Sequence, residues 1–188
     1  MAGELWLIRH GETAWSLSGA HTGRTDLPLT AEGERRAAAL PAKLAGHDFK
    51  LVLTSPLQRA RRTCELAGFG AVAQIDPNLS EWDYGDYEGR SSADIHRDRP
   101  GWNPFRDGFP GGETIEQVAV RARAVIGRAL DAHGNAALFA HGHILRILTA
   151  CWLEMPPDAA RSFFLGTAGI STLGYEHETR VIVRWNLQ

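Results

Sequence analysis

Short runs of apolar residues alternate with longer amphipathic stretches along the chain. The clearest runs span residues 5–8 and 136–140, and residues 50–54 have three apolar residues at their centre. Uninterrupted apolar runs of this length are typical of strands buried on both faces of a parallel sheet. Because each run is followed by a segment with helical spacing, the pattern predicts a repeated strand and helix arrangement.

The first two helices are expected to begin at capping residues. Thr30 is placed to cap a helix over residues 31–44, in which Pro41 is expected to cause a kink or an early end. Ser55 precedes the next helix, and the order Ser-Pro-Leu-Gln predicts that Ser55 caps it, with Pro56 at its first position. Arg59 would then lie in the first turn.

Two further helices are predicted in the second half of the chain. Apolar residues recur every three or four positions after Thr114 and stop at Gly134, as in an amphipathic helix. Another helix is expected over residues 144–153.

The remaining segments are shorter or irregular. A strand is expected near residues 72–75, and the alternating residues 170–175 and 181–185 predict a closing hairpin. Residues 78–112 have little periodicity beyond a short helix near 93–97, and we interpret them as an ordered insertion over the sheet. The whole pattern predicts one α/β domain over residues 1–188, a three-layer α/β/α sandwich with a mostly parallel sheet.

Composition narrows the possible partners. The formal net charge is −2 and the 20 basic residues form no continuous face, so we expect no nucleic acid partner. The two cysteines show no metal-binding spacing, which favours a reducing compartment and no structural zinc. Without a secretory signal or an apolar stretch of about 18 residues, the protein is expected to be cytoplasmic and not bound to membranes. The oligomeric state is left open.

Each of the three predicted apolar strands is followed closely by an arginine or a histidine. Ligands of parallel α/β folds gather outside the carboxyl ends of the strands, so Arg9, His10, Arg59 and His141 are expected to meet there. Guanidinium groups bind phosphate oxygens in pairs, and helix N-termini add backbone N–H donors. We therefore expect two arginines and two helix starts to bind a small phosphate ester.

The same residues suggest a chemistry. A neutral imidazole among cations is a good nucleophile toward phosphorus, and either His10 or His141 fits this role. The other imidazole would stabilise the oxygens of the transferring group. Departure of an alkoxide needs a proton, and Glu81 in the insertion is the candidate donor, although other carboxylates lie nearby in sequence.

Four sequence blocks carry a resemblance to a known family. They are residues 7–13 (LIRHGET), 54–63 (TSPLQRARRT), 80–89 (SEWDYGDYEG) and 140–143 (AHGH). Together they resemble the histidine phosphatase superfamily, to which phosphoglycerate mutases belong. The resemblance implies a phosphoglycerate mutase-like fold, phosphorylation of His10, a phosphate pocket of Arg9, Arg59 and His141, and proton donation by Glu81.

Departures from the mutases favour hydrolysis. The mutases usually have asparagine where Ser16 and His143 stand, and they carry a longer insertion over the site. Residues 82–89, 102–103, 106–108 and 112–114 instead resemble the sedoheptulose-bisphosphatase-like branch. This resemblance implies a sugar phosphate or bisphosphate as substrate. We expect the reaction to need neither a metal nor a cofactor. The candidate substrate contacts are Thr22, Gly23, Arg24, Tyr84, His143 and Arg146.

Three alternatives remain open at this point. A divalent metal held by His10, His21, His141 and His143 would make the protein a metal-dependent hydrolase, although two nearby arginines would repel the ion. A phosphoglycerate mutase and a noncatalytic phosphoprotein-binding module are the other two. The remaining histidines are expected on the surface: His47, His96, His133 and His177.

Overall fold

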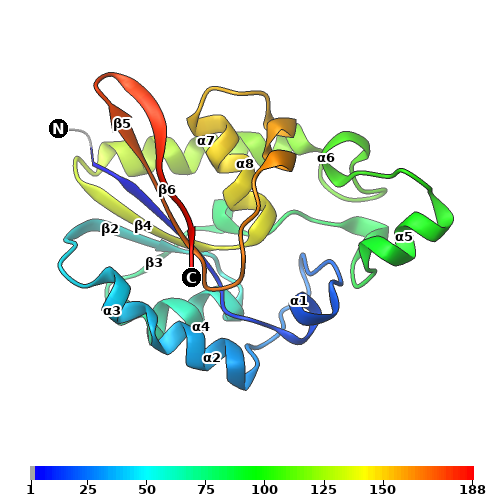
Figure 1. Ribbon diagram of the computed structural model, residues 1–188, viewed down its shortest axis with the longest axis horizontal. Helices are drawn as coiled ribbons and strands as arrows, with labels where there is room; N and C mark the ends of the chain where they lie inside the picture. The colour runs from blue at the N-terminus through cyan, green and yellow to red at the C-terminus, as the bar shows by residue number, and fades with distance from the viewer. Residues whose placement is uncertain (1–2) are drawn as a thin grey trace.

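The computed structural model describes residues 3–188 as a six-stranded sheet with helices on both faces (Figure 1). The strands are β1 (Leu5–Arg9), β2 (Phe49–Thr54), β3 (Gln74–Ile75), β4 (Asn135–Ala140), β5 (Ile170–Glu176) and β6 (Thr179–Leu187). Their order across the sheet is β3-β2-β4-β1-β5-β6. The first four are parallel and β5 and β6 form an antiparallel hairpin, so the predicted α/β fold is confirmed.

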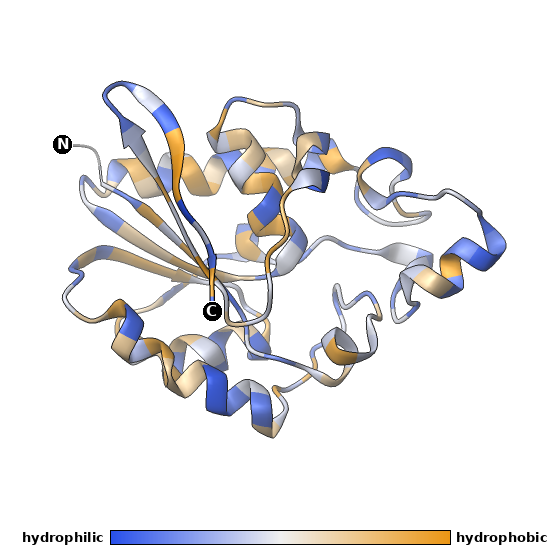
Figure 2. Ribbon diagram, viewed as in Figure 1, coloured by the Kyte–Doolittle hydropathy of each residue, from blue (hydrophilic) through white to orange (hydrophobic). Residues whose placement is uncertain are grey.

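Alternate side chains of the central strands face two different helical layers. On one side, Leu5 and Leu7 pack in a cluster with residues of α7 (Ile115–Asp131) and α8 (Gly142–Trp152). On the other, Trp6 and Ile8 pack with residues of the layer formed by α2 (Ala31–Ala38), α3 (Leu40–Leu44) and α4 (Gln58–Leu66). Figure 2 shows the apolar strands enclosed between helices whose outer faces are polar. Burial on both faces explains why these strands read as continuous apolar runs.

Of the two predicted caps, one is confirmed and one is wrong. Thr30 caps α2, and Ala39 separates α2 from α3 just before Pro41, as the proline predicted. Thr114, after which the helical pattern begins, caps α7. Ser55 does not cap α4, which begins at Gln58. The Ser55 hydroxyl instead contacts His141, 2.7 Å away, and Asp26 from another loop accepts the Gln58 N–H at 2.8 Å.

The insertion forms short helices around an aromatic cluster. Its elements are η1 (Pro77–Leu79), η2 (Gly85–Tyr87), α5 (Ser92–Asp98) and α6 (Pro104–Asp107), which include the predicted short helix. It lies beyond the carboxyl ends of the strands, at the right of Figure 1, and not across a face of the sheet as expected. Six aromatic side chains are buried there: Trp82, Tyr84, Tyr87, Trp102, Phe105 and Phe109.

Within residues 3–188, no helix has the length and apolar character needed to cross a membrane. The four histidines predicted at the surface, His47, His96, His133 and His177, are all exposed.

Candidate active site

A polar cavity of about 180 Å³ lies at the carboxyl end of β1. It is lined by Arg9 and His10 after β1, by Glu81 and Tyr84 of the insertion, and by residues near the start of α8. The complete lining is Arg9, His10, Ser16, Gly19, Ala20, His21, Thr22, Glu81, Tyr84, Gly142, His143, Arg146, Phe164 and Leu165. Segments far apart in sequence therefore meet where the strand pattern predicted.

His10 is held in one orientation by its neighbour. Its Nδ1 lies 2.7 Å from the Gly11 carbonyl oxygen, which can only accept, so Nδ1 carries the hydrogen. Burial lowers the pKa of His10 well below its ordinary value, and Arg9 and Arg59 lower it further. The imidazole is therefore neutral near pH 7, with its lone pair on Nε2. His10 lines the cavity, and a neutral imidazole with a free lone pair is chemically able to act as a nucleophile.

His141 and Arg59 lie behind His10 and do not line the cavity. Both are fully buried, and the His10 and His141 rings are 5.1 Å apart between centroids. Arg59 Nε donates to His141 Nδ1 at 3.1 Å, so His141 carries its hydrogen on Nε2, which lies 2.7 Å from the Ser55 hydroxyl. Burial also lowers the pKa of His141, which is therefore neutral. This tautomer makes His141 a donor and not a second nucleophile.

Arg59 is largely occupied by the protein itself. Its Nη1 and Nη2 donate to the backbone carbonyls of Thr22, Gly23 and Thr25, at 2.9 to 3.0 Å. In this state Arg59 orders the loop after α1 (Ala14–Ser18) and orients His141.

Arg9 lines the cavity and has one buried donor without a partner among the described residues. Its Nη1 donates to the Leu165 carbonyl at 2.6 Å, whereas its buried Nε has no partner among the described residues. Gly142 leaves room for the guanidinium, since a Cβ there would lie 3.4 Å from Arg9 Cζ. An unpartnered charged donor is costly to bury. Because the Arg9 side chain lines the cavity, its guanidinium is available to an anionic oxygen there.

Glu81 occupies the N-terminus of α8. Its carboxylate accepts the N–H groups of His143 and Ile144 at 3.0 and 2.9 Å, together with that of Trp82 at 3.0 Å. Glu81 therefore accepts two of the N–H groups at the start of α8, and Asp26 accepts that of Gln58 in α4. Gly142, the first residue of α8, lines the cavity, so the expectation that helix starts offer N–H groups to phosphate stays a prediction.

Four of the six candidate substrate contacts line the cavity: Thr22, Tyr84, His143 and Arg146. The Tyr84 hydroxyl lies 2.5 Å from His143 Nδ1. Burial lowers the pKa of His143 well below its ordinary value and that of Arg146 to about 10. At neutral pH, His143 is thus uncharged and Arg146 is cationic.

The other two candidates lie outside the cavity. The Gly23 N–H donates to the Glu88 carboxylate at 2.9 Å, and a Cβ at Gly23 would clash with the Trp82 carbonyl. Arg24 has a side chain 81% exposed and is paired with Asp83 at 2.8 Å. Both residues line a neighbouring pocket that also includes Glu81, so their contact with the substrate stays a prediction.

The four histidines considered as metal ligands form two separate pairs. His10 faces His141, whereas His21 stacks on His143 with 6.0 Å between ring centroids. Residues 3–188 contain no group of three or more His, Cys, Asp or Glu side chains placed to hold a metal ion.

Sequence reasoning missed several residues of the site. Ser55 was assigned to a helix cap, and His21 was considered only as a metal ligand although it lines the cavity. Phe164 and Leu165 arrive from the loop after η3 (Pro157–Ser162) and belong to no recognisable motif. The sequence contains no signal for these two residues, because only the fold brings this loop to β1.

Comparisons with known proteins identify the family of the chain. Residues 5–188 match the model of the histidine phosphatase superfamily (branch 1). An acid phosphatase of Mycobacterium tuberculosis is 38% identical, with 94% of this chain and 88% of the relative covered. Sedoheptulose 1,7-bisphosphatase of Saccharomyces cerevisiae is 37% identical, with 79% and 67% covered.

A solved structure from Mycobacterium tuberculosis, described as the product of an open reading frame, superposes on the chain with a TM-score of 0.93. Its sequence is 34% identical, and the superposition covers 99% of this chain and 98% of the other. With an Arg-His pair at the end of β1 and this match over nearly its full length, the chain belongs to the histidine phosphatase superfamily, branch 1, whose phosphatase members hydrolyse phosphate esters.

Proposed function

We propose that this protein is a phosphomonoesterase that transfers the phosphoryl group of its substrate to Nε2 of His10. The observation that carries the proposal is the His10 ring itself, which is buried, neutral and fixed through Nδ1–H to the Gly11 carbonyl. The guanidinium of Arg9, which lines the same cavity, supports an anionic substrate.

The proposed reaction has two steps. In the first, His10 Nε2 bonds to phosphorus while the bond to the leaving oxygen breaks, and Glu81 gives that oxygen a proton. The positive charge that develops on the ring is stabilised by the Nδ1–H bond to Gly11, and Arg9 stabilises the phosphoryl oxygens. In the second, water attacks phosphorus, the P–N bond breaks and Glu81 accepts the proton of the water.

A sugar phosphate or bisphosphate is the proposed substrate class. Two relatives with this fold are an acid phosphatase and a sedoheptulose bisphosphatase. In the cavity, Arg146 provides a second cationic side chain besides Arg9, and Thr22, Tyr84 and His143 provide polar groups suited to sugar hydroxyls. We propose that Arg146 binds a second phosphate or a charged substituent of the substrate.

Rapid-quench trapping of the phosphoenzyme tests the mechanism. A substrate labelled with ³²P should leave acid-labile, alkali-stable phosphate on the wild-type protein and none on His10→Ala. His133→Ala, which removes an exposed histidine, is the matched control. Retained turnover by a folded His10→Ala variant would contradict the proposal.

A panel of substrates distinguishes hydrolysis from the alternatives. Sugar phosphates, sugar bisphosphates, phosphoglycerates and phosphopeptides are each incubated with the protein, with and without a chelator. Phosphate release that survives chelation is expected. Interconversion of phosphoglycerate isomers without release would instead show a mutase, and binding of phosphopeptides without turnover would show a noncatalytic module.

A further inference from the structure

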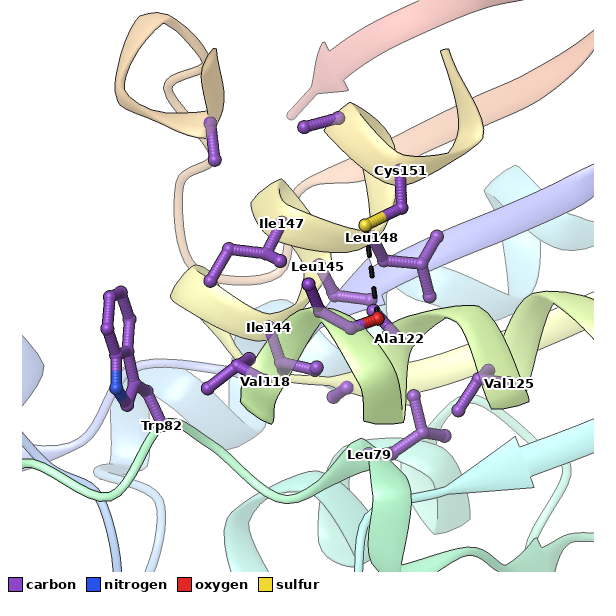
Figure 3. Packing of buried hydrophobic residues seen from close by; sticks show 14 of the residues in the cluster. Leu79, Trp82, Val118, Ala122, Val125, Ile144, Leu145, Ile147, Leu148 and Cys151 are labelled. Atoms are coloured by element: carbon purple, nitrogen blue, oxygen red, sulfur yellow. Dashed lines mark hydrogen bonds between the residues drawn. The ribbon is translucent and has the colours of Figure 1, made fainter. Parts of the chain in front are cut away.

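Glu81 lies on an irregular segment, yet a proton donor must be placed within a fraction of an ångström. The flanking side chains Leu79 and Trp82 are buried, and Figure 3 shows Leu79 directed at α7 beside Val125. Apolar packing fixes the segment against the helices but does not by itself orient the peptide groups on either side of Glu81.

An ion pair between Arg121 of α7 and Glu113, which precedes the helix, supplies that orientation. Arg121 and Glu113 form a bidentate pair, with Nε–Oε1 and Nη2–Oε2 distances of 2.9 and 2.8 Å. Their side chains are only 18% and 23% exposed, so water screens the pair weakly. The planar fork of Arg121 is thereby fixed before it makes any other contact.

The pair then bonds to the chain on both sides of Glu81. Arg121 Nη1 donates to the carbonyls of Asn78 and Ser80, at 2.8 and 3.0 Å, and the Ser80 carbonyl belongs to the peptide group that enters Glu81. Beyond Glu81, the Glu113 carboxylate accepts the Asp83 N–H at 3.0 Å. The Glu113 backbone also accepts from Trp82 Nε1 at 2.9 Å and donates to the Asp83 carbonyl at 3.1 Å.

We infer that Arg121 and Glu113 are positioning residues for the proton donor Glu81. Neither side chain lines the cavity, so neither contacts a substrate bound there. Both act by holding the backbone from Ser80 to Asp83. The inference rests on the proposed function, since it requires Glu81 to protonate the leaving oxygen.

The test compares two leaving groups through kcat/KM, which reports the first irreversible step and so excludes hydrolysis of the phosphoenzyme. An alkyl ester such as glycerol phosphate needs a proton on its leaving oxygen, whereas 2,4-dinitrophenyl phosphate does not. Arg121→Met and Glu113→Gln should each lower kcat/KM for the alkyl ester by about 10 to 100-fold. The value for the dinitrophenyl ester should change by less than about 3-fold.

Two further variants separate the possible explanations. Arg128→Met is the control, because Arg128 lies on the same helix and pairs with buried Asp76 at 2.9 Å without bonding to residues 80–83. It should leave both substrates unaffected. The double variant of Arg121 and Glu113 should lose little more than either single variant, since the two act as a unit.

Glu81→Gln shows whether the underlying function holds. It should lower kcat/KM for the alkyl ester by about 10² to 10⁴-fold and spare the dinitrophenyl ester. Selectivity in Glu81→Gln but equal losses on both esters in Arg121→Met and Glu113→Gln would overturn the positioning role alone. Equal losses in Glu81→Gln itself would overturn the proton-donor assignment and the positioning role with it.

Discussion

His21 should make the protein less stable in mild acid, by an amount that the structure specifies. The side chain lines the cavity, is 9% exposed, and packs against Tyr84, Trp102 and Phe109. Burial lowers the pKa of His21 to about 4 from its ordinary 6.5. Below pH 6.5 the unfolded chain therefore takes up a proton that the folded protein does not, and stability falls with pH.

The size of this loss of stability follows from the difference between the pH and the pKa of His21 in the unfolded chain. A pH of 5 is about 1.5 units below the pKa of this histidine in the unfolded chain, and each unit corresponds to about 1.36 kcal/mol. Since the folded pKa is about 4, nearly the full difference applies at pH 5. His21 should thus contribute about 2 kcal/mol to the fall in unfolding free energy between pH 7.5 and pH 5.

Urea unfolding of the wild type and of His21→Gln at both pH values measures this contribution. The glutamine cannot take up a proton, so the variant should lose about 2 kcal/mol less than the wild type on going to pH 5. Any loss of packing in the variant affects both pH values and cancels in the difference. His47→Gln, which removes an exposed imidazole, is the control. An identical pH dependence in the wild type and His21→Gln would refute the reasoning.

Three other outcomes are expected. Arg146→Met should raise KM for a sugar bisphosphate much more than for p-nitrophenyl phosphate; steady-state kinetics decide. Thr114→Ala should lower the free energy of unfolding by about 1 kcal/mol in urea, because the α7 capping box is lost. Cys64, whose pKa burial raises to about 12, should react with iodoacetamide at pH 8 only as fast as the protein unfolds, as followed by mass spectrometry.

The fold was predictable because its signals are local. Burial on both faces makes the buried stretches of β1, β2 and β4 largely apolar, and the cap Thr30 acts within one helical turn. The Ser55 interpretation failed because the partner of its hydroxyl, His141, lies 86 residues away. A side chain with a strong long-range partner is not free to cap a helix.

The site was predictable to the extent that it follows the strand ends. His10 and Arg9 come directly after β1, so topology alone places them at the cavity. The parts that could not be predicted depend on tertiary contacts: the carboxylates that bind the helix N-termini, the pairing of Arg24 with Asp83, and the loop that brings Leu165 to Arg9. None of these contacts joins residues within a single element.

The use of the α8 N-terminus changes how the site stabilises charge. A free helix start would favour the phosphoryl oxygens, but the N–H groups of His143 and Ile144 are bonded to Glu81. In the proposed first step, Glu81 becomes negative as it gives up its proton, and the positive end of α8 faces that charge. The phosphoryl oxygens are then left to donors that Glu81 does not occupy, and both Arg9 and Gly142, the first residue of α8, line the cavity. The charge on Glu81 and the charge on the phosphoryl oxygens are thus stabilised by separate groups.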